Sequence, residues 1–191
     1  MALTDIDIAN AVFIKLGLMP AVSLSEPTDQ VTAFNNIFPI LRRRALMAGK
    51  WRFARIRASL TKNATDPVFD WDAAYDIPAA SLLVLSTDDD GLPWLVEGTT
   101  ILTNRDSMTI IYIRDEKDPN KFIHLFVEAL TELVASELAV ALTGRADLKE
   151  EHFKIYLHKM QEARTLESQQ GTPPTLTMDE LESARFGSAY G

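Results

Sequence analysis

The residues best suited to chemistry in this sequence are the cations of residues 41–60, LRRRALMAGKWRFARIRASL. This basic segment contains seven Lys and Arg residues and no acid, although the whole chain has a formal net charge of -8. A positive segment in an acidic protein is typical of a surface that binds something negative. The partner could be nucleic-acid phosphate, an acidic part of the same fold, or the acidic surface of a neighbouring subunit.

The same segment carries the aromatic residues Trp51 and Phe53, which could stack on nucleic-acid bases. Aromatic residues next to a helix end more often plug the core and fix the exit of the chain. The consecutive residues Arg42–Arg44 fan through about 200° around a helix, which suits several acidic neighbours better than the reading of base edges. We therefore predict a structural box of Trp51, Phe53, Ala54 and Leu60. The candidate subunit-interface cations are Arg42, Arg43, Arg44, Arg52, Arg55 and Arg57.

Catalytic and metal-binding signatures are not recognisable. The sequence has no GxxxxGK[ST] or GxGxxG phosphate loop and no cysteine. His152 and His158 are six residues apart, about 120° around a helix, so they cannot share a metal unaided. Residues 88–91, DDDG, indicate a hairpin turn, because an EF-hand loop would need Gly and Glu where the chain has Pro93 and Thr99. The sequence predicts no enzyme, no cofactor and no metal.

The elements that must position the basic segment are helices. Helical spacing predicts helices over residues 5–16 and 28–48, and the second ends inside the basic segment. Short apolar runs separated by turns predict antiparallel strands over 68–113. Two more helices are predicted over 120–142 and 145–168. Apolar residues surround more than half of the first of these, which predicts burial on several sides and a share in a subunit interface. The candidate interface residues on it are Phe122, Phe126, Leu130 and Leu138.

The predicted fold is mainly α. Residues 1–66 and 118–168 form a four-helix core, and residues 67–117 form a small antiparallel β insertion between the helix pairs. Residues 169–191 are polar, lack periodicity and are predicted to be a flexible C-terminal arm. No apolar run approaches the roughly 20 residues of a membrane span, so no membrane partner is expected.

A series of short boxes resembles a known family. The boxes are Trp51-Arg52-Phe53-Ala54 followed by Arg57 and Leu60, Tyr75-Asp76-Ile77-Pro78, Trp94-Leu95-Val96-Glu97-Gly98, Tyr112-Ile113, Phe122, Glu128-Ala129-Leu130 and Leu138-Ala139. In order and spacing they are similar to the head-to-tail adaptor proteins of tailed bacteriophages, especially the tail tubular protein A group. The likeness runs from about residue 5 to 165. One departure is Ile77-Pro78-Ala79-Ala80, which lacks the acid of the family's Leu-Pro-x-Asp box.

The resemblance implies a structural virion protein, assembled in the host cytoplasm and located at the head–tail connector. Such subunits form a ring, typically of about twelve copies, between the portal protein and the tail tube or nozzle. Genomic DNA passes through the channel without sequence-specific binding. The expected portal-docking arm carries Met178, Leu181, Phe186 and Tyr190. Two alternatives stay open: a small DNA-binding protein that uses residues 41–60, and a virion-associated hydrolase.

Overall fold

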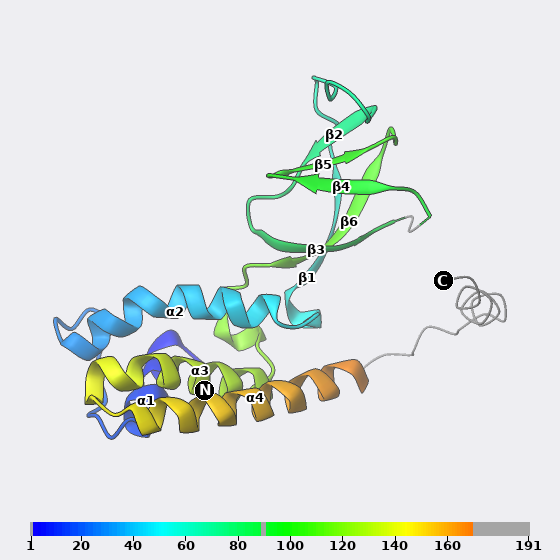
Figure 1. Ribbon diagram of the computed structural model, residues 1–191. Helices are drawn as coiled ribbons and strands as arrows, with labels where there is room; N and C mark the ends of the chain where they lie inside the picture. The colour runs from blue at the N-terminus through cyan, green and yellow to red at the C-terminus, as the bar shows by residue number, and fades with distance from the viewer. Residues whose placement is uncertain (1, 89–90, 170–191) are drawn as a thin grey trace.

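A layer of helices forms the base of the molecule in this computed structural model, which describes residues 2–88 and 91–169. The described helices are α1 (Asp5–Lys15), α2 (Asp29–Met47), α3 (His124–Thr143) and α4 (Ala146–Gln169), with short 3-10 turns at η1 (Arg52–Ala54) and η2 (Pro119–Lys121). A β module, residues 55–114, stands on the side of the layer that α2 occupies (Figure 1).

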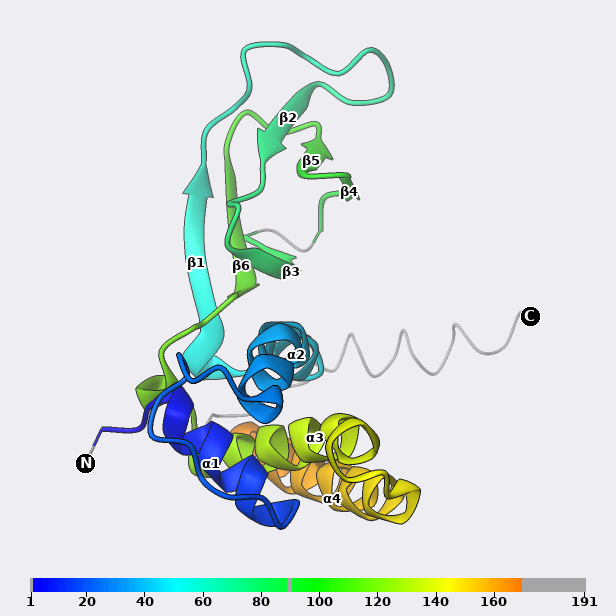
Figure 2. The same ribbon diagram turned by 90° about the vertical axis from the view of Figure 1, so that its left-hand side faces the viewer.

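The β module consists of two three-stranded antiparallel sheets (Figure 2). One sheet has the order β1-β6-β3 and the other β2-β5-β4. The strands are β1 (Arg55–Leu60), β2 (Ala73–Asp76), β3 (Ser81–Thr87), β4 (Trp94–Glu97), β5 (Thr100–Thr103) and β6 (Met108–Arg114). The chain enters through β1 and leaves through β6, and these strands pair with Arg55 opposite Ile113. Entry and exit are therefore tied together by one ladder.

The prediction of a mainly α fold with a small β insertion is wrong. The described residues are 48% helical and 20% strand, with two three-stranded antiparallel sheets, and form a mixed α/β fold. The strands also begin at Arg55, inside the part of the chain that was assigned to the helical core. The physical reason is that Ile56, Ala58 and Leu60 alternate with polar residues and face the β module.

Each part of the molecule has its own hydrophobic core. The helical core contains the inner faces of all four helices together with Trp51 and Ala54. The β module encloses a second, smaller core of Ala73, Tyr75, Ile101, Met108, Ile110 and Tyr112. The two parts also touch directly, because Ile113 of β6 belongs to the helical core and Leu82 and Leu85 of β3 pack against it.

Helix α3 is the centre of the helical layer, packed against α1, α2 and α4. The prediction that it is buried on several sides is confirmed, since residues 129–136 are all buried. The same burial corrects the interface prediction for this helix. The predicted interface residues Phe122, Phe126, Leu130 and Leu138 are core residues of the single chain.

Local sequence signals set several helix ends. The hydroxyl of Thr28 accepts a hydrogen bond from the Val31 backbone N–H and caps α2, and α2 then continues through Pro39 to Met47. Gly144 ends α3 with a φ of 71°, a left-handed conformation that glycine adopts without strain. Among the described helices, none is long and apolar enough to cross a membrane.

Candidate assembly site

Trp51 anchors the junction between the helical layer and the β module. Its side chain is 0% exposed and its indole N–H donates to the Ala45 carbonyl at 3.0 Å. The ring stacks on Phe53 and meets Phe126 edge-on, with centroids 5.8 and 5.0 Å apart. The predicted box residues thus share one environment, and Ala54 is buried beside them. Leu60 does not join it, because it lies farther along β1 and packs on the β-module core.

Gly49 is required by the position of this indole. A Cβ atom built on Gly49 would lie 2.5 Å from Cε2 of Trp51, far inside van der Waals contact. A ring atom fixed by packing on both faces cannot move aside easily. The Gly49-x-Trp51 pair therefore lets the chain turn tightly out of α2 into η1.

Arg42 and Arg43, at the start of the basic segment, bind an acidic residue of the same chain. The Arg42 guanidinium lies 3.1 Å and the Arg43 guanidinium 2.9 Å from the carboxylate of Asp115, just after β6. Arg42 is buried and also lies over the Phe38 ring at 5.8 Å. Burial raises the pKa of Asp115, but hydrogen bonds from Arg43 and Arg42 outweigh burial and hold this pKa below its usual range.

Two further carboxylates, Glu137 and Glu116, form ion pairs with residues next to Arg43 and Asp115. We call these ion pairs, together with those of Asp115, the ion-pair belt. Arg44 lies 3.4 Å from Glu137 on α3. Glu116 is buried and pairs with Lys121 at 3.0 Å and with Arg114. Burial raises the pKa of Glu116, yet these partners and the Asp118 backbone N–H together lower it to about 2. The ion-pair belt therefore clamps α2 to the exit of the β module with charges that stay ionised at neutral pH.

The later cations of the basic segment have a different environment. Lys50, Arg52 and Arg55 line a cavity of about 220 Å³ together with Arg164 of α4, and we call these four residues the basic cleft. Within the described part of the chain, none of the four forms an ion pair with a carboxylate. The one acid in the lining, Glu167, accepts a hydrogen bond from the Arg52 backbone N–H. The cleft thus holds a surplus of positive charge.

The guanidinium of Arg55 is held in the cleft by a backbone carbonyl rather than by a carboxylate. Its Nη2 donates to the Lys50 carbonyl at 3.1 Å, which fixes the guanidinium, while its Nε is buried and has no hydrogen-bond partner among the described residues. A buried donor without an acceptor is costly. Arg57, farther along β1, is exposed and lies outside the cleft.

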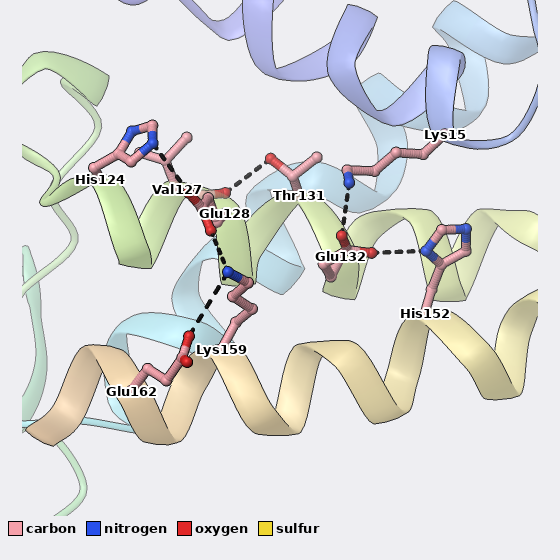
Figure 3. A network of polar contacts seen from close by, with 9 residues as sticks. All are labelled: Lys15, His124, Val127, Glu128, Thr131, Glu132, His152, Lys159 and Glu162. Carbon is pink, nitrogen blue, oxygen red and sulfur yellow. Dashed lines mark hydrogen bonds and ion pairs between the residues drawn. The ribbon is translucent and has the colours of Figure 1, made fainter.

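Sequence reasoning missed a second polar cluster, which lies between α1, α3 and α4 (Figure 3). Buried Glu132 accepts from Lys15 at 2.7 Å through one oxygen and contacts His152 Nδ1 at 2.7 Å through the other. One turn away, Glu128 lies 2.7 Å from Lys159 and 3.0 Å from His124. The sequence signal was Glu128 and Glu132 at i,i+4 spacing on a helix that is mostly apolar.

This cluster ties helices together. Both oxygens of Glu132 are occupied by cations or potential cations, and the nearby Thr131 hydroxyl donates to the Val127 carbonyl of its own helix. Catalysis through an activated nucleophile needs a hydroxyl bonded to its base. No such pair exists here, and no group of three potential metal ligands is found within residues 2–88 and 91–169.

The remaining predicted site residues, Met178, Leu181, Phe186 and Tyr190, lie outside the described residues. Comparison of the chain with protein-family models and with curated protein sequences finds no match. What the site can do is therefore argued from its own residues. One half of the basic segment is neutralised within the chain, and the other half offers a cleft for an anion.

Proposed function

We propose that this chain is a structural subunit of a tailed-phage head-to-tail connector. It forms a ring below the portal, typically of about twelve copies in the family that it resembles, joins the portal to the tail and lets DNA pass. The resemblance of its sequence boxes supports this proposal. So does the position of the box residues, since Trp51 and Phe53 hold the joint between the two separately cored parts.

One observation carries the proposal: large apolar side chains are exposed at two extremities of the molecule. Met19 and Val22, on the α1–α2 loop, are 80% and 94% exposed. Val68 and Phe69, on the β1–β2 loop at the tip of the β module, are 96% and 74% exposed (Figure 2). These four are the most exposed of the large apolar side chains in the described residues, where none of the others exceeds 63%, and each pair is suited to the apolar part of a contact with another protein. Two such places, far apart, suit a subunit that has neighbours on several sides.

The net negative charge suits the DNA channel of such a ring. With a formal net charge of -8, the subunit as a whole repels phosphate, so DNA can slide past it without being held. A DNA-binding protein that uses residues 41–60 fits less well. Arg42 and Arg43 are bound to Asp115, and Trp51 is buried and cannot stack on bases.

Light scattering and electron microscopy, with and without the portal protein encoded in the same genome, test the proposal. We expect a monomer or weakly associated chain alone and closed rings on the portal. A variant that lacks residues 170–191 should bind the portal more weakly, since the proposed docking arm is removed. A compact monomer that never joins the portal would contradict the proposal.

A further inference from the structure

The basic cleft lies at one end of the helical layer, where α2 and α4 both finish (Figure 1). An exposed apolar side chain, Met47, lies in the last turn of α2, three residues before Lys50. The combination of unpaired cations and an exposed apolar group is typical of a protein–protein contact. Free Arg and Lys side chains alone would suit any anion.

The opposite end of the layer has the opposite charge. There the α1–α2 loop, the start of α2 and the end of α3 line a cavity of about 390 Å³ that includes Met19, Glu26 and Asp29. Glu150 and Glu151 are exposed near the start of α4, and neither forms an ion pair with a described residue. We call these residues, with Val22, the acidic end. Of the cations at this end, Arg145 is paired with Asp147 and Lys149 with Glu137, whereas Lys154, one turn after Glu150, forms no ion pair with a described carboxylate.

The two ends cannot meet within one molecule. Helices α2 and α4 both run from the acidic end to the basic cleft, so their lengths separate the two surfaces (Figures 1 and 2). Both surfaces lie in the helical layer, at the same level below the β module. A neighbouring copy placed beside the first can therefore present its acidic end to the cleft.

We infer that the basic cleft of one copy binds the acidic end of the next copy. This contact rests on the proposed ring and specifies which surfaces form it. It is heterologous, since two different surfaces meet, and heterologous contacts close into rings when the rotation between copies permits. Carboxylates of the neighbour pair with Arg52 and Arg164, whose exposed side chains have no carboxylate partner among the described residues.

Helix dipoles explain only part of this charge pattern. Acids at helix starts and bases at helix ends stabilise a single helix, and Asp29 in the first turn of α2 follows that rule. Lys50, Arg52 and Arg55 lie beyond α2, on η1 and β1, where the effect of the helix dipole has faded. The exposure of Met19 and Val22 has no dipole explanation at all.

Charge reversal tests the contact in the full chain with the portal. The cleft-reversed variant Arg52→Glu/Arg164→Glu and the end-reversed variant Glu150→Lys/Glu151→Lys should each lower the yield of rings at least about tenfold, because like charges then face each other. The variant that combines all four changes should recover rings, since its two surfaces are complementary again. Rings are counted by electron microscopy.

Matched controls separate this effect from general loss of charge or fold. Lys62→Glu/Lys117→Glu makes the same change in net charge as the cleft-reversed variant, at exposed positions away from both surfaces, and should form rings as the wild type does. Circular dichroism checks that each variant is folded. If the cleft-reversed variant is unfolded, the neutral variant Arg52→Gln/Arg164→Gln replaces it, with a smaller expected loss of rings.

The outcomes distinguish the two proposals. If the wild-type chain forms no ring on the portal, the proposed function itself fails. If rings form but persist in the reversed variants, or do not return in the four-fold variant, the contact alone is overturned. The contact is equally overturned if the cleft-reversed variant keeps its rings but loses retention of DNA, which would assign the cleft to nucleic-acid phosphate.

Discussion

The two halves of the basic segment have similar residue types but different partners: the first half forms ion pairs within the chain, and the second half does not pair with a described carboxylate. Arg42, Arg43 and Arg44 lie on α2, opposite carboxylates at the end of β6 and on α3, and are neutralised within the chain. Lys50, Arg52 and Arg55 follow only a few residues later but meet the end of α4, where Glu167 is the one acid among the described residues of the cleft. Net charge along a sequence therefore does not tell which cations are free. The turn at Trp51 separates the two groups.

The largest effect should come from removing that turn. Trp51→Ala deletes a fully buried aromatic side chain and its hydrogen bond to Ala45, and should lower the free energy of unfolding by about 4 kcal/mol. Urea denaturation followed by circular dichroism measures it. Val22→Ala, at an exposed position, serves as the control and should change stability little. A loss below 1 kcal/mol for Trp51→Ala would mean that the box does not hold the joint.

Among the residues that pair with Arg42, Arg43 and Arg44, substitution of Asp115 should lower the free energy of unfolding most. Asp115→Ala leaves the buried Arg42 without its carboxylate and should cost about 3 kcal/mol, because an unpaired buried charge remains. A double-mutant cycle with Arg42→Ala should show strong coupling between the two residues. The exposed pair of Arg145 with Asp147 provides the comparison, since Asp147→Ala should cost less than about 1 kcal/mol. Equal losses at both sites would remove the distinction between buried and exposed pairs.

Low pH should weaken the ion pairs of Asp115 and Glu116 and so lower the free energy of unfolding. The pKa values of Asp115 and Glu116 are lowered in the folded chain, Glu116 from 4.5 to about 2, so the folded state binds fewer protons than the unfolded state. Their contribution to stability is fully present above the unfolded pKa and is lost as the pH falls from about 5 toward about 2. Denaturation at stepped pH values measures this loss. Glu116→Gln should reduce the change in the free energy of unfolding with pH. An unchanged pH dependence would contradict the role of Glu116 in the ion-pair belt.

Substitutions in the basic cleft should change the free energy of unfolding least. Arg52→Ala and Arg164→Ala remove exposed side chains that form no ion pair with a described carboxylate, so each should change the free energy of unfolding by less than about 0.5 kcal/mol. Their thermal midpoints should match that of the wild type. A large loss from either would show that the cleft is needed for folding rather than for contact with another molecule.

The helices and the buried box were predictable because their signals are local. The stripe of Val31, Phe34 and Phe38 has helical spacing, and a tryptophan with a glycine two residues before it indicates a tight exit. The extent of the sheets was not predictable in the same way. In β1, Arg55 and Arg57 suggested a basic surface, and this charge hid the alternation of Ile56, Ala58 and Leu60.

The sequence did not show which residues distant along the chain lie together in the fold. Asp115 lies 73 residues from Arg42, and nothing in either neighbourhood announces the pair. The same holds for the basic cleft, where Arg164 joins cations more than a hundred residues earlier. The apolar surface of α3 was read as a possible interface because sequence shows how apolar a helix is but not how many helices surround it.

The most direct test of the account is a cryo-electron microscopy map of the ring on its portal. It should show Arg42 and Arg43 still bound to Asp115 within each copy, and Arg52 and Arg164 within ion-pair distance of the carboxylates at the acidic end of the next copy. A ring in which the basic cleft faces solvent or the DNA channel, or in which Arg42 and Arg43 leave Asp115, would contradict the division of the basic segment into a paired half and a binding half.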